Sequence, residues 1–334
     1  MAEAIRADRR TRAVCAGALS VVFPAAAALA QTVASYPNRP ITLVVPYTPG
    51  SGIDILARVI APKLNRKWGE PVVVDNKPGA SGIIGADAVA KAAPNGYTLM
   101  VTVNSFTMTP PLYRDMPYDP IADFTPIAKI ALARYAFAVN PTVLPVRDFP
   151  AFVAAVKAKP GALNYGSPGN GTAFHLAMEL LKQHLGLQIT HVPYKGLSGA
   201  MTDLHGGRVQ MMFGTVHALL PGQKAGKLKF LAVTGPRRSP FAPDVPTFRE
   251  RGFDFMDDID GWYAVMGPAG LPRDIVAKLN AELRAIMFSE DVREELTAQG
   301  LLPFASTPEE LAALIKADLP RWAKVVAKAK ISAD

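Results

Sequence analysis

The segment from Ile41 to Arg58 reads ITLVVPYTPGSGIDILAR and predicts a short apolar strand, a turn of prolines and glycines, and an amphipathic helix. Ser51 and Asp54, three residues apart, fit a capping box at the helix start. A helix that begins here directs free backbone N–H groups beyond the end of the strand. In open α/β sheets this is where ligands bind, and free N–H groups favour an anion. On this stretch alone, helix capping is the favoured interpretation of both side chains.

The same alternation of strand and helix recurs along the chain and predicts an α/β protein with parallel strands. Two apolar extended runs, residues 127–139 and 261–267, are long enough to leave one unit and enter another. We therefore expect two Rossmann-like lobes joined by two crossing strands. Lobe 1 is expected to be discontinuous, from residues 36–135 and 262–330, and lobe 2 to span residues 136–261. Two lobes joined in this way can close like a hinge over a ligand.

The first thirty residues have the pattern of a secretory signal peptide, with four arginines, an apolar core and the small-residue site Ala28-Leu29-Ala30. Cleavage near Ala30 would remove Cys15, the single cysteine, and leave no disulfide or Cys-based metal site. It would also remove four arginines and two acids, so the net charge of +8 becomes 8 − 4 + 2 = +6. The remaining basic residues are scattered, which argues against nucleic-acid binding.

No motif in the sequence indicates a cofactor or a metal ion. The glycine-rich turns match neither G-x-G-x-x-G nor the P-loop, so nucleotide binding is disfavoured. The five histidines do not have the spacing of a zinc site. Beyond the N-terminal segment, no run of eighteen apolar residues indicates a membrane span.

Four of the predicted strands end in a glycine-rich turn that opens a helix. These turns are residues 49–52, 78–82, 166–172 and 194–199. Two belong to each expected lobe, so facing lobes would line one cleft with backbone N–H groups and small hydroxyls. Such a surface suits a carboxylate or another oxyanion.

A hydrolase is the main alternative from another class. Ser167, His175 and Asp203 supply the residue types of a nucleophilic triad, but no G-x-S-x-G elbow surrounds any serine. His175 lies in the first turn of its helix, where we expect it to donate to a ligand or to hold the loop. Lys195 could provide a counter-charge, and His191 is expected to be a packing or surface residue. We predict no catalytic residue.

Several motifs resemble those of the Bug-type (TctC-like) receptors, the extracytoplasmic solute-binding proteins of tripartite tricarboxylate transporters. They are Tyr36-Pro-x-Arg-Pro-Ile-x-x-Val-Val-Pro-Tyr-x-Pro-Gly-x-Gly-x-Asp54, Val74-x-Asn-Lys-Pro-Gly-Ala-x-Gly82, Tyr165-x-Ser-x-Gly-x-Gly-Thr-x-x-His175, His191-Val-Pro-Tyr-Lys-Gly196 and Asp244-Val-Pro-Thr-Phe248. The resemblance runs in order from about Tyr36 to the C-terminal helix.

This resemblance implies a two-lobed periplasmic binding protein fold of the type II-like class, without catalysis. It implies a periplasmic monomer that binds a small carboxylated solute and delivers it to a membrane permease. A ligand-sensing receptor for a signalling system is a further alternative. The ligand contacts carried over from the family are Tyr47, Gly50, Ser51, Gly52, Asp54, Ala80, Ser81, Gly82, Asn104, Ser105, Ser167, Gly169, Asn170, Gly171, Thr172, His175, Lys195 and Gly196.

Three positions need a separate comment. Thr215 is added to the predicted ligand contacts because it lies at the end of the predicted strand that follows the turn of residues 194–199. Ile53 stands where the family usually has Thr, and we expect this change to favour a less polar ligand. Asp54 would repel a bare carboxylate, so we expect it to cap the helix or to hold a donor group of the ligand.

Overall fold

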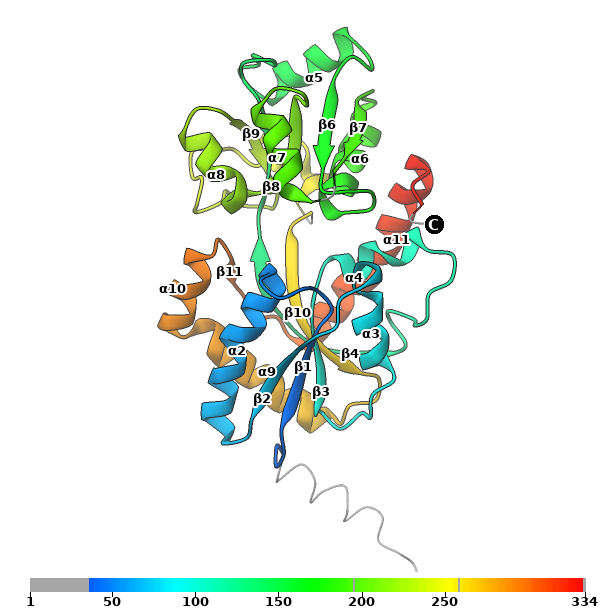
Figure 1. Ribbon diagram of the computed structural model, residues 1–334, viewed down its shortest axis with the longest axis vertical. Helices are drawn as coiled ribbons and strands as arrows, with labels where there is room; N and C mark the ends of the chain where they lie inside the picture. The colour runs from blue at the N-terminus through cyan, green and yellow to red at the C-terminus, as the bar shows by residue number, and fades with distance from the viewer. Residues whose placement is uncertain (1–35, 195, 258, 333–334) are drawn as a thin grey trace, which may run out of the picture. The chain divides into compact units, whose positions relative to one another are not determined.

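The computed structural model of the chain describes residues 36–194, 196–257 and 259–332. The predicted signal peptide, Cys15 and Lys195 lie outside these described residues. From Pro37 onward the described residues belong to one compact unit. This unit contains two mixed β-sheets with helices packed on them (Figure 1), which confirms the α/β prediction.

The first sheet has six strands in the order β11-β4-β10-β3-β1-β2. Their bounds are β1 Ile41–Val45, β2 Val72–Asn76, β3 Thr98–Val103, β4 Phe124–Ala133, β10 Gly261–Pro268 and β11 Leu302–Pro303. The helices around it are α2 Gly52–Trp68, α3 Ile83–Ala90, α4 Ser105–Met108, α9 Arg273–Phe288, α10 Glu290–Ala298 and α11 Pro308–Ala329, with short 3₁₀ turns at Ala80–Gly82 and Pro110–Leu112. The apolar strand and helix of the opening segment are therefore β1 and α2. The short helix α4 and the two-residue strand β11 were not predicted from the sequence.

The second sheet has five strands in the order β7-β6-β8-β5-β9. Their bounds are β5 Tyr135–Val139, β6 Asn164–Ser167, β7 Thr190–Pro193, β8 Met211–Thr215 and β9 Lys229–Val233. Its helices are α5 Phe149–Ala158, α6 Ala173–Leu185, α7 Leu197–His205 and α8 Val216–Lys224, followed by 3₁₀ turns at Arg249–Arg251 and Asp254–Met256.

The predicted crossing strands are present. The run over residues 127–139 is divided by Arg134 into the end of β4, in the first sheet, and β5, in the second. The run over residues 261–267 is β10, which brings the chain back to the first sheet. In Figure 1 these strands link the sheet of β1–β3 with the sheet of β6–β9.

The βαβ strands are parallel, as expected, and the crossing strands are not. β1 pairs in parallel with β2 and β3, and β6 with β7 and β8. β10 runs antiparallel to β3, and β5 antiparallel to β8. Each of these strands enters its sheet at the carboxyl end of the parallel strands, so it must run against them.

A buried polar cluster joins the two crossings. Arg134 forms an ion pair with Asp260, the residue immediately before β10, and both side chains are about 10% exposed. Thr234 Oγ1 donates to Asp260 Oδ1 at 2.6 Å and accepts from the backbone N–H of Tyr135 at 3.0 Å. The turn at Gly235 has φ +86°, and a Cβ placed there would lie 1.7 Å from Arg134 Nη1. Glycine is required there by both the backbone angle and the available space.

The C-terminal helix α11 contributes to two hydrophobic cores. Leu311 and Ile315 belong to a core with Val44, Met100 and Trp262 of the first sheet. Farther along the helix, Trp322, Val325 and Val326 belong to a core with residues of the second sheet and α6. Gln183 Nε2 of α6 also donates to the carbonyl of Val325 at 2.9 Å. The exact division of the chain into lobes stays a prediction.

Candidate ligand-binding site

The strand order places the predicted turns in two groups. β1 and β2 are parallel neighbours, as are β6 and β7, so the carboxyl ends of each pair lie at one sheet edge. The turns after β1 and β2 open α2 and α3, and those after β6 and β7 open α6 and α7. The carboxyl edges of parallel strands are where open α/β proteins bind ligands.

Tyr47 ties the first group together. Its hydroxyl donates to the carbonyl of Ser81 at 3.0 Å and is hydrogen-bonded to Ser105 Oγ at the start of α4. A Cβ at Gly82 would lie 3.3 Å from this hydroxyl. Burial is the main cause that raises the pKa of Tyr47. The structure thus brings Tyr47, Ser81, Gly82 and Ser105 together, around a cavity of about 10 Å³.

The turn after β2 has an unusual backbone. Ala80 and Ser81 have φ of +45° and +55°, between Gly79 at +134° and Gly82 at +96°. Non-glycine residues rarely adopt the left-handed region, and such strain is concentrated at functional sites. Both Ala80 and Ser81 are exposed, so they are accessible to a ligand.

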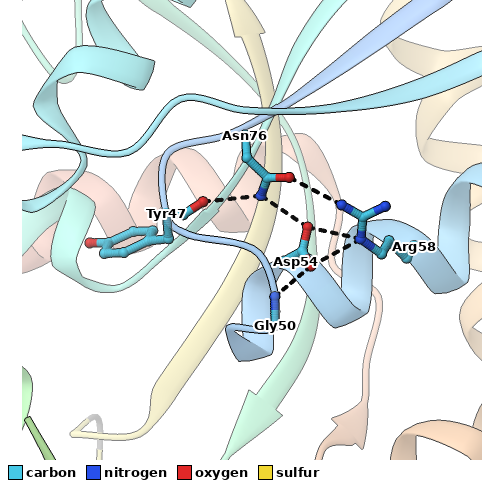
Figure 2. Close-up of polar contacts among 5 residues, drawn as sticks. All are labelled: Tyr47, Gly50, Asp54, Arg58 and Asn76. Carbon is cyan, nitrogen blue, oxygen red and sulfur yellow. Dashed lines mark hydrogen bonds and ion pairs between the residues drawn. The ribbon is translucent and has the colours of Figure 1, made fainter.

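The capping-box prediction is wrong. Ser51 is the N-cap of α2 but makes no side-chain cap hydrogen bond. The Asp54 carboxylate instead accepts from the Gly50 N–H at 2.8 Å, from Arg58 Nε at 3.0 Å and from Asn76 Nδ2 at 2.9 Å (Figure 2). The Ser51 N–H donates instead to the carbonyl of Thr48 at 3.3 Å.

The hydrogen bonds around Asp54 hold the loop of residues 47–50 on its buried side. Asn76 Nδ2 also donates to the carbonyl of Tyr47 at 3.0 Å, and Arg58 Nη2 donates to Asn76 Oδ1 at 3.1 Å (Figure 2). Burial opposes ionisation of Asp54, but the hydrogen bonds from Arg58, Gly50 and Asn76 outweigh it and hold its pKa below the usual range. Asp54 therefore orders residues 47–50.

The N-terminus of α2 carries a second feature. Ser51 Oγ is buried and has no hydrogen-bond partner among the described residues. Gly50 and Gly52 beside it are exposed. Buried hydroxyls nearly always have a partner, and this one lies at a helix N-terminus, whose first N–H groups lack partners within the helix. By contrast, the side chain of Ile53 is only 4% exposed.

In the second group, Ser167 and Thr172 hold the loop after β6. Ser167 Oγ donates to the carbonyl of Gly169 at 3.0 Å and accepts from the Gly169 N–H at 3.2 Å. Thr172 is the N-cap of α6 and accepts from the His175 N–H. His175 Nδ1 in turn accepts from the Gly171 N–H at 3.0 Å. His175 therefore holds the loop, which was one of its two expected roles.

This geometry contradicts the hydrolase alternative. Ser167 is fully buried, and its Oγ contacts His191 Nε2 at 2.7 Å rather than His175. Asp203 is paired with the Tyr194 hydroxyl and with Arg208. Ser167, His175 and Asp203 therefore do not form the hydrogen-bonded series that a nucleophilic triad requires.

The other predicted contacts are distributed as follows. Asn104 is buried and its Nδ2 donates to the Tyr135 hydroxyl at 2.8 Å. Asn170 is exposed. Gly196 N donates to the carbonyl of Pro168 at 3.1 Å, which joins the turns after β6 and β7. Lys195 lies outside the described residues.

Two observations place residues that pack on the first sheet next to residues of the second sheet. A Cβ at Gly171 would lie 2.4 Å from Leu112 Cδ1, so the loop after β6 packs against the 3₁₀ turn after α4. A cavity of about 280 Å³ is lined by Gly52, by Thr215 and by Tyr263 of β10. A Cβ at Gly52 would lie 3.1 Å from the Tyr263 hydroxyl, and burial raises the pKa of Tyr263 to about 12. Tyr263 is not among the contacts predicted from the sequence, although it lies in a predicted crossing strand.

The fold and these turns define a class of two-lobed α/β binding proteins, the periplasmic binding proteins, as the solved neighbours confirm. More particularly, the chain belongs to the TctC family, described as the tripartite tricarboxylate transporter family receptor, whose model matches residues 56–331. Its members are periplasmic receptors and not enzymes. Among the described residues, the structure has no helix with the length and hydropathy needed to cross a membrane.

Three known proteins illustrate the relationship. BugT of Bordetella pertussis is 36% identical over 91% of this chain and 94% of its own length. A Rhodopseudomonas palustris protein solved with adipate is 36% identical, with a TM-score of 0.74, and the match covers 89% of this chain and 99% of that one. MatC of the same organism, solved with malate, is 32% identical, with a TM-score of 0.71, and the match covers 87% and 100%.

Proposed function

We propose that this receptor binds a small carboxylated organic anion between the two groups of turns and delivers it to a permease of a tripartite transporter. The supporting observation is the N-terminus of α2, where exposed glycines and the unpartnered hydroxyl of Ser51 lie at free backbone N–H groups. The related structures solved with adipate and malate support the same class of ligand.

We further propose that the protein reaches the periplasm after cleavage near Ala30 and acts as a monomer. The apolar N-terminal pattern supports export. Delivery to a permease rests on the family description. A pull-down with the permease subunits, in the presence and absence of ligand, tests that step.

The binding proposal is tested by calorimetry and thermal shift with adipate, malate, a tricarboxylate and an aromatic monocarboxylate. A ligand at 100 times its Kd stabilises the folded state by roughly 2.7 kcal/mol. For a chain of this size that corresponds to a rise in Tm of about 5 °C. No response to any of the four classes would contradict the proposal.

Two serine and threonine variants separate ligand contact from helix capping. Ser51→Ala removes a hydroxyl that makes no cap bond, so we expect little change in stability and a weaker Kd. Thr307, in contrast, forms a complete capping box at the start of α11. Thr307→Ala should lower stability by about 1 kcal/mol and leave the Kd unchanged.

A further inference from the structure

Two histidine rings, His175 of α6 and His191 of β7, form a stack behind the loop of residues 167–172, which we name the second-sheet loop. Their ring centroids are 3.9 Å apart and their planes differ by 12°. His191 also stacks on Tyr165, with centroids 4.7 Å apart. The register of the parallel pair explains this contact, because Tyr165 and His191 are directly opposite each other.

Each ring of this histidine pair makes one hydrogen bond to the loop. His191 Nε2 is hydrogen-bonded to Ser167 Oγ at 2.7 Å, at the beginning of the loop. His175 Nδ1 accepts from the Gly171 N–H at 3.0 Å, near its end. A backbone N–H can only donate, so His175 must be neutral with its proton on Nε2. The two rings therefore hold the two ends of the loop.

The surroundings keep both rings neutral. Burial is the first cause that lowers the pKa of each histidine to about 4, and the positive charge of Lys182 acts in the same direction. Lys182 is itself paired with Glu179, which accepts from the Tyr165 hydroxyl at 2.6 Å. For His191 the neighbouring His175 also lowers the pKa, while Glu179 raises it.

We propose that His191 is a positioning residue for ligand binding, which acts through Ser167 to fix the second-sheet loop. Ser167 Oγ contacts the carbonyl and the N–H of Gly169 and is hydrogen-bonded to His191. Loss of the histidine leaves the buried hydroxyl of Ser167 short of one hydrogen-bond partner and frees the turn at Gly169. The inference rests on the proposed function, since it assumes that this loop contacts the carboxylate.

Two variants of His191 separate its hydrogen bond from its ring. His191→Phe keeps the stack on His175 and Tyr165 but has no donor for Ser167. His191→Gln keeps a donor at the reach of Nε2 but loses the stack. If the hydrogen bond between residue 191 and Ser167 positions the loop, His191→Phe should raise the Kd for adipate about tenfold with unchanged secondary structure. His191→Gln should keep most of the wild-type affinity. Malate is the probe if adipate does not bind the wild type.

His184→Phe is the matched control. His184 lies on α6, the helix that also carries His175. Its ring stacks on the aromatic ring of Phe255, with centroids 4.0 Å apart. Its Nδ1 contacts the carbonyl of Leu180, within the helix and not in the loop. This variant should bind adipate like the wild type.

Hydrogen exchange gives a readout that general destabilisation would not move. The Gly169 and Gly171 amides should exchange faster in His191→Phe, while amides of the first group keep their protection. If His191→Phe does not fold, His191→Gln is compared with His191→Asn, which is too short to reach Ser167. The proposal is overturned if the variant without the bond binds adipate within twofold of wild type. If instead the wild type binds no carboxylate, the proposed function is what fails.

Discussion

Replacing Asp54 by Asn should destabilise the protein far more than loss of an ordinary surface acid. The Asp54 carboxylate is 3% exposed and accepts from Gly50, Arg58 and Asn76. An Asn side chain would direct an N–H₂ group at one of these donors and would remove the negative charge beside Arg58. Hydrogen bonds to charged groups contribute about 1.5–3 kcal/mol each and are not additive. Because Arg58 is 54% exposed, solvent screens the charge term, and we expect a total loss of about 2–4 kcal/mol.

Urea unfolding of the mature chain, with m unchanged, measures this loss as a shift in Cm. Asp87→Asn is the matched control, since Asp87 and Lys91 form the same i,i+4 pair on α3 with the lysine 68% exposed. That change should cost less than about 0.5 kcal/mol. If Asp54→Asn were equally mild, the loop after β1 would not depend on its carboxylate and the assignment of Asp54 as its organiser would be refuted.

Three further changes test other parts of the structure. Acid should destabilise the protein as the pH falls from about 6.5 to about 4, because the unfolded histidines bind protons that the buried pair excludes, and His191→Phe should flatten this profile in chemical unfolding. Gly235→Ala should lower the free energy of unfolding by about 1–2 kcal/mol because of its positive φ, and by more because the new methyl group displaces Arg134. Gly226→Ala, with φ +69° and open space around it, should show the backbone effect alone. Ile53→Thr should shift the Kd ratio towards malate over adipate in calorimetry, and an unchanged ratio would remove Ile53 as a determinant of ligand choice.

The features predicted from the sequence are those with a local pattern. The strand, turn and helix of residues 41–58 and the two crossing runs are each encoded within about twenty residues, and the structure confirms them. The helix start at Pro308 also follows from adjacent residues, since Thr307 and Glu310 form its capping box.

The contacts that decide the candidate site are not local. Asp54 could not be separated from a capping residue, because its competing partner Asn76 is 22 positions away and meets it only when β2 pairs with β1. His191 had been expected to be a packing or surface residue, since its contact with Ser167 arises from the β6–β7 register. The left-handed backbone at Ala80 has no signal of its own, because alanine rarely adopts that conformation.

The two groups of turns are held by different chemistry, and this has a consequence for how they respond to acid. The first is held by an ionised carboxylate, whose pKa lies below its ordinary value of 3.8. The second is held in part by the neutral imidazole of His175, whose Nδ1 loses its hydrogen bond from the Gly171 N–H on protonation. Between about pH 6.5 and pH 4 the Asp54 carboxylate stays ionised and keeps its hydrogen bonds. Over the same range the free energy needed to open the second-sheet loop and expose the histidine pair falls steadily, because exposed histidines bind protons. Acidification should therefore loosen the second-sheet loop first, and the loop around Gly50 should keep its order to a lower pH.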